Sequence, residues 1–257
     1  MEIATIAGLL LALAGIVGGL ILEGGSLAQI LQPTAAMIVL GGTFGAVLVS
    51  FPLNTFMTAM LGFLKILKPP VSDPFAVIEQ LAEFSTKARK EGIVSLEADA
   101  KNLKDEFLRK AIMMAVDGAD PKEIQHTLET QLGYMNEHGM TIPKVWEAAG
   151  GYAPTVGIIG AVMGLIQVMQ HLDNIEEVGH GIAVAFVATI YGVGCSNIIF
   201  LPAATKLTLQ HKKDIVIKEM IIEGIVMVIE GVNPMVIRDK LSGFFVEKSK
   251  QVEAEKK

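Results

Sequence analysis

The residues best placed to do chemistry lie in two long apolar stretches, residues 150–170 and 181–205. Thr189 carries a hydroxyl in the middle of the second stretch. Inside an apolar helix, a threonine hydroxyl either bonds to the backbone carbonyl four residues earlier or lines an ion path, where it can relay or coordinate. The sequence leaves both interpretations of Thr189 open.

Two prolines mark the same stretches. Pro154 lies near the start of the first stretch and Pro202 near the end of the second. If the stretches form antiparallel spans, both prolines approach the same side of the membrane. Because proline lacks a backbone N–H and can kink a helix, the pair is interpreted either as helix-end punctuation or as a hinge that couples the membrane to the cytoplasmic region.

No group suited to enzymatic catalysis accompanies these residues. The two stretches contain no Asp, Glu, Lys or Arg, and the single cysteine, Cys195, has no metal-binding His or Cys spacing around it. The formal net charge of −6 gives no support to nucleic-acid binding. We therefore expect a protein that is not an enzyme and has no catalytic residue, bound metal or cofactor. An ion pathway through it would need a carboxylate from a partner subunit.

A charged segment outside the apolar stretches is the other candidate site. It contains Arg89, Lys90 and Glu97 on a predicted amphipathic helix and just beyond it. Exposed charges of this kind are usually solvated, and a partner surface is the alternative.

The elements that must position these residues are predicted to be membrane-spanning helices. Hydrophobic residues make up 51% of the 257 residues, and the mean hydropathy is +0.51. About 20 apolar residues in a helix cross a bilayer core of about 30 Å. Four stretches meet that length, and the first is interpreted as a retained span because no basic segment precedes it. The predicted spans cover residues 3–22, 34–51, 150–171 and 181–203.

The charges divide the chain further. All 21 Lys and Arg lie in residues 65–144 and 206–257, and the two short loops between paired spans hold none. The positive-inside rule places both basic regions and both termini in the cytoplasm. The predicted fold is therefore all-α and polytopic, with the following parts: an N-terminal transmembrane hairpin over residues 1–64, a cytoplasmic helical domain over 65–149, a second hairpin over 150–205, and a cytoplasmic helical extension with a charged tail over 206–257.

Helix punctuation is regular in the cytoplasmic parts. Asp73-Pro74, Asp120-Pro121 and Asn233-Pro234 each fit a helix start, with a capping side chain before a proline in the first turn. Between the first two starts, apolar spacing predicts one continuous helix over residues 94–116.

Small residues recur four apart within the spans. Such pairs allow two helices to approach closely, either inside one chain or between subunits. The pairs are Gly15/Gly19, Gly41/Gly45, Gly160/Gly164 and Ala188/Gly192.

Over nearly its whole length the sequence resembles the MotA/PomA family of flagellar stator proteins. Two predicted hairpins are separated by a predicted cytoplasmic domain, which is compact compared with that of long family members. The segments that carry the resemblance are Ala88-Arg-Lys-Glu-Gly with Leu96-Glu97, Ala115-Val-Asp-Gly118, Tyr152–Ile166 and Ala185–Gly192.

The resemblance implies a function and partners. Family members form a pentamer around a dimer of a MotB-like, single-span, peptidoglycan-anchored protein whose aspartate takes the ion. The complex converts ion-motive force into torque on a FliG-like switch ring, in the bacterial inner membrane. The resemblance assigns Thr189 to the ion path, Pro154 and Pro202 to coupling, and Arg89, Lys90 and Glu97 to the switch-ring contact.

Ala161 bears on the transported ion. The resemblance implies a second threonine there in sodium-driven members, so this chain keeps fewer oxygen ligands along the path. We therefore expect protons as the ion.

Three alternatives stay open from the sequence. One is a sodium-coupled stator of the PomA/MotP type. Another is an ExbB/TolQ-like energiser, against which the N-terminal hairpin argues. The third is a membrane scaffold that conducts nothing.

Overall fold

The computed structural model describes residues 3–67 and 73–254, and every regular element within these ranges is helical. Residues 68–72, at the start of the predicted cytoplasmic domain, and 255–257, at the end of the predicted tail, lie outside the described residues. Four helical stretches are long and apolar enough to cross a membrane. The predicted all-α, four-span fold is confirmed. The stretches are Ile3–Leu22, Pro33–Ser50 and apolar windows within Pro121–Gln170 and Ile175–Ile229.

The chain divides into two compact units. The first, here called the membrane unit, comprises residues 1–69 and 139–209, and the second, the charged unit, comprises residues 70–138 and 210–257. The long helix α11 (Leu201–Ile229) contributes residues to both units.

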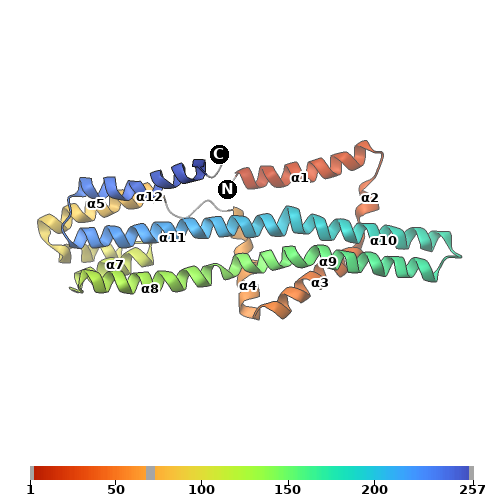
Figure 1. Cartoon of the computed structure of the whole chain (residues 1–257), viewed down its shortest axis with the longest axis horizontal. Helices are drawn as coiled ribbons and strands as arrows, with labels where there is room; N and C mark the ends of the chain where they lie inside the picture. The colour runs from red at the N-terminus through yellow and green to blue at the C-terminus, as the bar shows by residue number, and fades with distance from the viewer. Residues whose placement is uncertain (1–2, 68–72, 255–257) are drawn as a thin grey trace. The chain divides into compact units, whose positions relative to one another are not determined.

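The membrane unit is built around an antiparallel pair of helices. α9 (Thr141–Gln170) and α10 (Ile175–Gly194) run side by side, and α3 (Pro33–Ser50) packs against α9 (Figure 1). A π-helical segment, η3 (Cys195–Phe200), joins α10 to α11. The remaining helices of the unit are α1 (Ile3–Leu22), α2 (Leu27–Ile30), α4 (Leu53–Gly62) and η1 (Phe63–Leu67).

Prolines fix the corners of the N-terminal half of this unit. Gln32 and Phe51 precede Pro33 and Pro52, and both have extended backbones. The ring of a following proline disfavours helical geometry, so α3 begins at the first corner and ends at the second. α1 buries none of its residues against the described chain.

A cluster of aromatic rings packs together in the membrane unit, with members from α3, η1, α9 and η3. Trp146 of α9 packs against Phe63 and Phe200, with ring centroids 4.6 and 5.7 Å away, and its Nε1 donates to the carbonyl of Ala59 at 3.2 Å. Phe44 of α3 makes an edge-on contact with Phe200 of η3. This cluster joins α3, α4, α9 and η3 next to Pro202.

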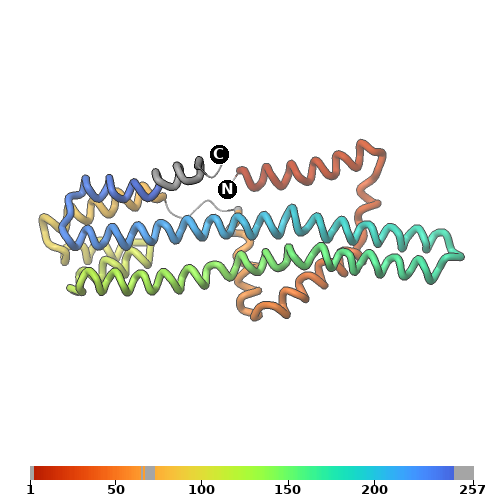
Figure 2. The backbone as a smooth tube through the Cα atoms, viewed as in Figure 1, coloured from red at the N-terminus to blue at the C-terminus, as the bar shows by residue number. Residues whose placement is uncertain are grey.

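The charged unit packs amphipathic helices in layers. Its elements, besides most of α11, are α5 (Pro74–Glu91), η2 (Ile93–Leu96), α6 (Glu97–Lys101), α7 (Glu106–Val116), α8 (Pro121–Gly139) and α12 (Pro234–Ala254). In Figure 2 the first turns of α12 run along α5, and the two helices are in contact. Large apolar side chains from α5, η2, α7, α8, α11 and α12 form its core, including Leu81, Leu96, Leu108, Ile112, Leu128, Met220, Ile221 and Leu241.

The predicted start signals of the charged unit are confirmed. Asp73 accepts the N–H of Phe75 at 3.0 Å, and Asn233 accepts that of Met235 at 2.9 Å. The predicted continuous helix over residues 94–116 is wrong. The chain leaves the helix after Lys101 and restarts at Glu106, because the Asp105 carboxylate caps a new N-terminus by accepting two backbone N–H groups.

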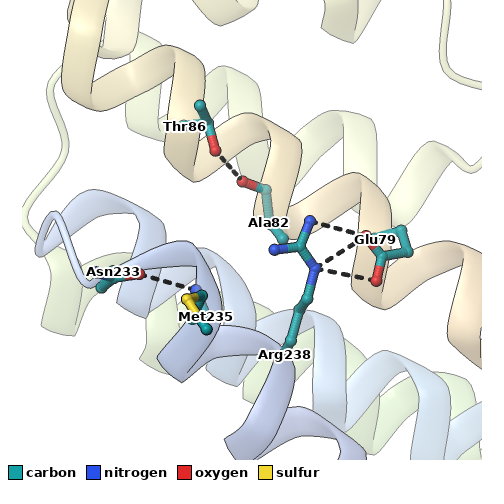
Figure 3. A network of polar contacts seen from close by, with 6 residues as sticks. All are labelled: Glu79, Ala82, Thr86, Asn233, Met235 and Arg238. Carbon is teal, nitrogen blue, oxygen red and sulfur yellow. Dashed lines mark hydrogen bonds and ion pairs between the residues drawn. The ribbon is translucent and has the colours of Figure 1, made fainter.

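One ion pair ties the last helix to the first in this unit. The guanidinium of Arg238 on α12 holds both oxygens of Glu79 on α5, at 2.9 and 3.0 Å from Nε (Figure 3). Nearby, the buried hydroxyl of Ser85 donates to the carbonyl of Val232 at 2.7 Å. α12 is therefore fixed against α5 by this ion pair as well as by apolar packing, and the segment before α12 is held to α5 by the Ser85 hydrogen bond.

Candidate functional site

The antiparallel pair α9/α10 is held by direct backbone contact. A Cβ on Gly192 would lie 2.6 Å from the carbonyl oxygen of Ala153, and one on Gly157 would lie 2.9 Å from that of Ala188. A Cβ on Gly164 would meet the carbonyl of Gly181 at 2.7 Å. No side chain larger than hydrogen fits at these three positions without a shift of backbone.

The small-residue pairs of the sequence therefore divide into two groups. The pairs Gly160/Gly164 and Ala188/Gly192 pack inside the hairpin. At Gly15, Gly19, Gly41 and Gly45, an added methyl group would find no atom of the described chain within 4 Å. Close packing within one chain is thus confirmed for the second hairpin only.

Thr189 lies half-buried on α10, and its Cα faces Gly157 of α9. Its hydroxyl donates to the carbonyl of Ala185, four residues earlier, at 3.2 Å. The one hydroxyl proton is therefore engaged by the helix, while the oxygen lone pairs stay available to accept. Ala161 is half-buried one turn beyond Gly157 and offers no side-chain oxygen.

Neither proline ends a helix. Pro154 lies inside α9, where the helix continues on both sides, and Pro202 is the second residue of α11, directly after the π-helical η3. The interpretation of these prolines as helix-end punctuation is therefore wrong for both. A π segment next to a proline is a local irregularity of the kind often found at functional sites.

Ser196 was missed by the sequence reasoning. It lies in η3, it is buried, and its hydroxyl donates to the carbonyl of Gly150 on α9 at 2.6 Å. A signal for part of this contact is present in the sequence, since Pro154 cannot provide the N–H that Gly150 would receive in a regular helix. The donor itself depends on how α10 and α9 pair.

Tyr191 was also missed. Its hydroxyl donates to the carbonyl of Ile30 at 2.5 Å and accepts the N–H of Gln32 at 3.3 Å. These two backbone groups lie at the corner between α2 and α3, where no regular helix satisfies them. Because unpaired backbone groups that are shielded from water are costly, Tyr191 stabilises this corner and holds it near α10.

The charged unit carries the other predicted site residues. Arg89 and Lys90 are exposed in the last turn of α5, and Gly92, with φ of +85°, turns the chain towards α6. Glu97 opens α6 and pairs with Lys101 at 2.8 Å, and the hydrogen bond from Lys101 lowers the pKa of the Glu97 carboxyl. The three predicted residues therefore lie close along the chain, with Arg89 and Lys90 exposed at the end of α5 and Glu97 partly exposed at the start of α6.

A second ion pair links these two helices. Lys87 of α5 and Asp99 of α6 are joined at 2.8 Å, and this hydrogen bond raises the pKa of the Lys87 ammonium. The sequence reasoning did not single out either residue. Among the described residues no group of three or more His, Cys, Asp or Glu is placed to hold a metal ion.

Comparisons with known proteins agree with this architecture. Residues 6–92 match the Motility protein A N-terminal family, and residues 99–220 match the MotA/TolQ/ExbB proton channel family. The chain is 36% identical to Motility protein A of Helicobacter pylori (strain ATCC 700392 / 26695), over 95% of both chains.

Solved structures show the same fold. The structure of MotAB from C. jejuni has a TM-score of 0.90 at 32% identity, covering 95% of this chain and 96% of that one. The flagellar MotAB stator complex from Bacillus subtilis has a TM-score of 0.87 at 33% identity, covering 97% and 98%. The match of residues 6–92 to the Motility protein A N-terminal family separates the chain from the ExbB/TolQ alternative. With near-complete coverage and identity above 30%, the chain belongs to the MotA family of flagellar motility proteins.

Proposed function

We propose that this chain is the proton-driven stator subunit of a bacterial flagellar motor. The stator function follows from membership of the MotA family and from the likeness to MotAB stator complexes. The chain is accordingly a multi-pass membrane protein that works in an oligomeric assembly with a MotB partner. Its family is one of stator and ion-channel subunits and not an enzyme family.

The observation that supports the need for a partner is the chemistry of the second hairpin. Residues 150–170 and 181–205 contain no Asp, Glu, Lys or Arg, and α9 meets α10 through glycine. A proton pathway normally uses an ionisable group at membrane depth. We infer that a MotB-like aspartate provides it and that the chain forms a ring, expected to be a pentamer around a partner dimer, in the inner membrane with both termini cytoplasmic.

The proposed ion is the proton. The side-chain oxygens at these two positions of the proposed path are few, since Thr189 has one, whose proton is donated to its own helix, and Ala161 has none. A dehydrated metal cation needs several oxygens to replace its hydration shell, whereas a proton can pass along hydroxyls and water. No bound cofactor is needed for this transport.

The proposed switch-ring contact is the end of α5 together with the start of α6. Arg89, Lys90 and Glu97 present both signs of charge there. Charges arranged in this way favour electrostatic pairing with a FliG-like protein, in which complementary charges set register and specificity.

Motor rotation in sodium-free medium tests the ion assignment. The full chain is expressed with its MotB partner in cells whose own stator genes are deleted, and single-motor speed is recorded while sodium and pH are varied separately. We expect rotation without sodium and loss of rotation when the proton gradient is collapsed. Thr189→Val should slow rotation, and Thr189→Ser, which keeps the hydroxyl, should preserve it.

Two results would contradict these proposals separately. Rotation that requires sodium at constant proton-motive force would overturn the proton assignment and leave the stator function standing. Failure of the chain to copurify with any single-span partner would count against the proposed assembly itself.

A further inference from the structure

The backbone carbonyl of Gly150 lacks the partner that a regular helix would provide. In an α-helix this oxygen accepts the N–H of the residue four positions later, which here is Pro154. Gly150 is buried, and a Cβ on it would lie 2.5 Å from the side chain of Leu201. Because a buried carbonyl without a donor is unfavourable, the site requires a hydrogen bond from another element.

Ser196 provides this hydrogen bond across the hairpin. Its Oγ donates to the Gly150 oxygen at 2.6 Å, and the residue is 1% exposed. The hydroxyls of Thr189 and Thr205, before and after it in the chain, donate instead to carbonyls of their own helices. Ser196 therefore differs from them in reaching the neighbouring helix, at the oxygen that a proline has freed.

The π geometry of η3 keeps Ser196 on the face towards α9. Ser196 lies on the line of buried positions that faces α9 along α10. From Ser196 onward, every fourth residue on this line is buried through the π segment. These buried positions are Gly181, Ala185, Ala188, Gly192, Ser196, Phe200 and Ala204. A π turn holds more residues than an α turn, so this spacing keeps one face directed at α9.

The second proline stands where the π segment ends. The N–H of Leu201 donates to the carbonyl of Ser196, five residues earlier, and the next residue, Pro202, has no N–H to extend this pattern. Ser196 thus takes part in both irregularities. Its backbone carbonyl closes the π turn before Pro202, and its side chain satisfies the carbonyl freed by Pro154.

We propose that Ser196 is a positioning residue that joins the two proline sites, so that α9 near Pro154 and the α10–α11 junction near Pro202 shift as one body. Return of η3 to regular α geometry would rotate the Ser196 side chain away from α9 and leave the Gly150 carbonyl unpaired. The contact is independent of the transported ion, while its effect on torque rests on the stator function.

A double-mutant cycle on the purified full complex tests the contact. Ser196→Ala should lower the thermal midpoint by about 3–6 °C, because it leaves one buried acceptor unsatisfied. In a Pro154→Ala background, residue 154 regains its N–H and can pair with Gly150, so Ser196→Ala should then have little further effect. Thr205→Val, which removes a hydroxyl bonded within its own helix, is the matched control.

Torque per stator unit tests the positioning role. Single motors are followed as complexes join one at a time, which separates the number of assembled units from the torque of each. We expect Ser196→Ala to reduce torque per unit about two-fold or more. Ser196→Thr keeps a hydroxyl and should reduce torque less. A purely structural role would reduce the number of units and leave the torque of each unchanged.

The outcomes decide the proposal in each case. Equal effects of Ser196→Ala with and without Pro154, or unchanged torque per unit, would overturn it. If Ser196→Ala prevents assembly, recovery of assembly in the double variant supports the proposal, and failure to recover refutes it. If the unaltered chain and every variant all failed to rotate a motor, the result would contradict the proposed stator function and not the role of Ser196.

Discussion

The membrane unit and the charged unit are stabilised in different ways. In the membrane unit, α9 and α10 meet through glycine and alanine, and large apolar side chains such as Ile158 and Ile159 remain exposed. In the charged unit, large side chains such as Leu128 and Ile221 are fully buried. Lipid does not favour the burial of apolar surface as water does. Close backbone packing therefore holds the α9/α10 pair, whereas the hydrophobic effect holds the charged unit.

The sharpest test of this contrast adds one methyl group to the α9/α10 contact. Gly192→Ala would place a Cβ 2.6 Å from the carbonyl of Ala153 and 3.0 Å from the Cα of Gly157, and backbone atoms cannot yield as side chains do. We expect loss of rotation and of recoverable complex, measured by single-motor speed and size-exclusion yield. Gly194→Ala, on the same helix, is the control, because its added methyl would have no atom of another helix within 4 Å. Equal losses from both changes would show that contact with α9 is not the cause.

A matched methionine pair tests the core of the charged unit. Met220 is fully buried and Met235 is 74% exposed. Met220→Ala should destabilise the complex by about 2–5 kcal/mol through lost burial and the cavity left behind. Met235→Ala should stay within about 0.5 kcal/mol. Denaturant unfolding followed by circular dichroism measures both, and similar values for the two would contradict a core built by burial.

The smallest effect is expected from the Arg238–Glu79 pair. The hydrogen bond from Arg238 holds the pKa of the Glu79 carboxyl below its usual value of 4.5, so the pair stabilises the fold fully above that value. This stabilisation is lost as the pH falls through the lowered pKa of the folded state. Arg238→Gln should therefore reduce stability near pH 7 slightly and flatten its dependence on pH below 4.5, as read from thermal midpoints.

Arg109→Gln is the control for that experiment. It breaks the looser pair with Glu106, three residues earlier on the same helix, at 3.4 Å. A change in acid dependence as large as that of Arg238→Gln would argue against a special role for the contact between α12 and α5.

Local signals in the sequence were enough to predict much of the fold. Asp73 and Asn233 cap helices whose first residues are prolines, and the spans follow from uninterrupted apolar length. The prediction of one helix over residues 94–116 was wrong because the apolar spacing continues through the break. The Asp105 carboxylate caps a new helix start there, which the apolar spacing does not reveal.

The site was harder to predict than the fold. The orphan carbonyl of Gly150 follows from the position of Pro154 alone, yet its donor, Ser196, lies 46 residues away and depends on the π geometry of η3. Tyr191 bonds to Ile30 over 161 residues of chain. Contacts of this range depend on tertiary pairing, which the spacing of residue types does not encode.

The aromatic cluster around Trp146 in the membrane unit has a practical consequence. Trp146 is the one tryptophan of the sequence, and its indole lies against Phe200 within η3. A fluorinated tryptophan incorporated there would give the chain one magnetic resonance signal, whose chemical shift depends on the rings around it. A change of winding in η3 would move Phe200 relative to that indole. The protein thus contains its own spectroscopic reporter, in direct contact with the π-helical segment η3.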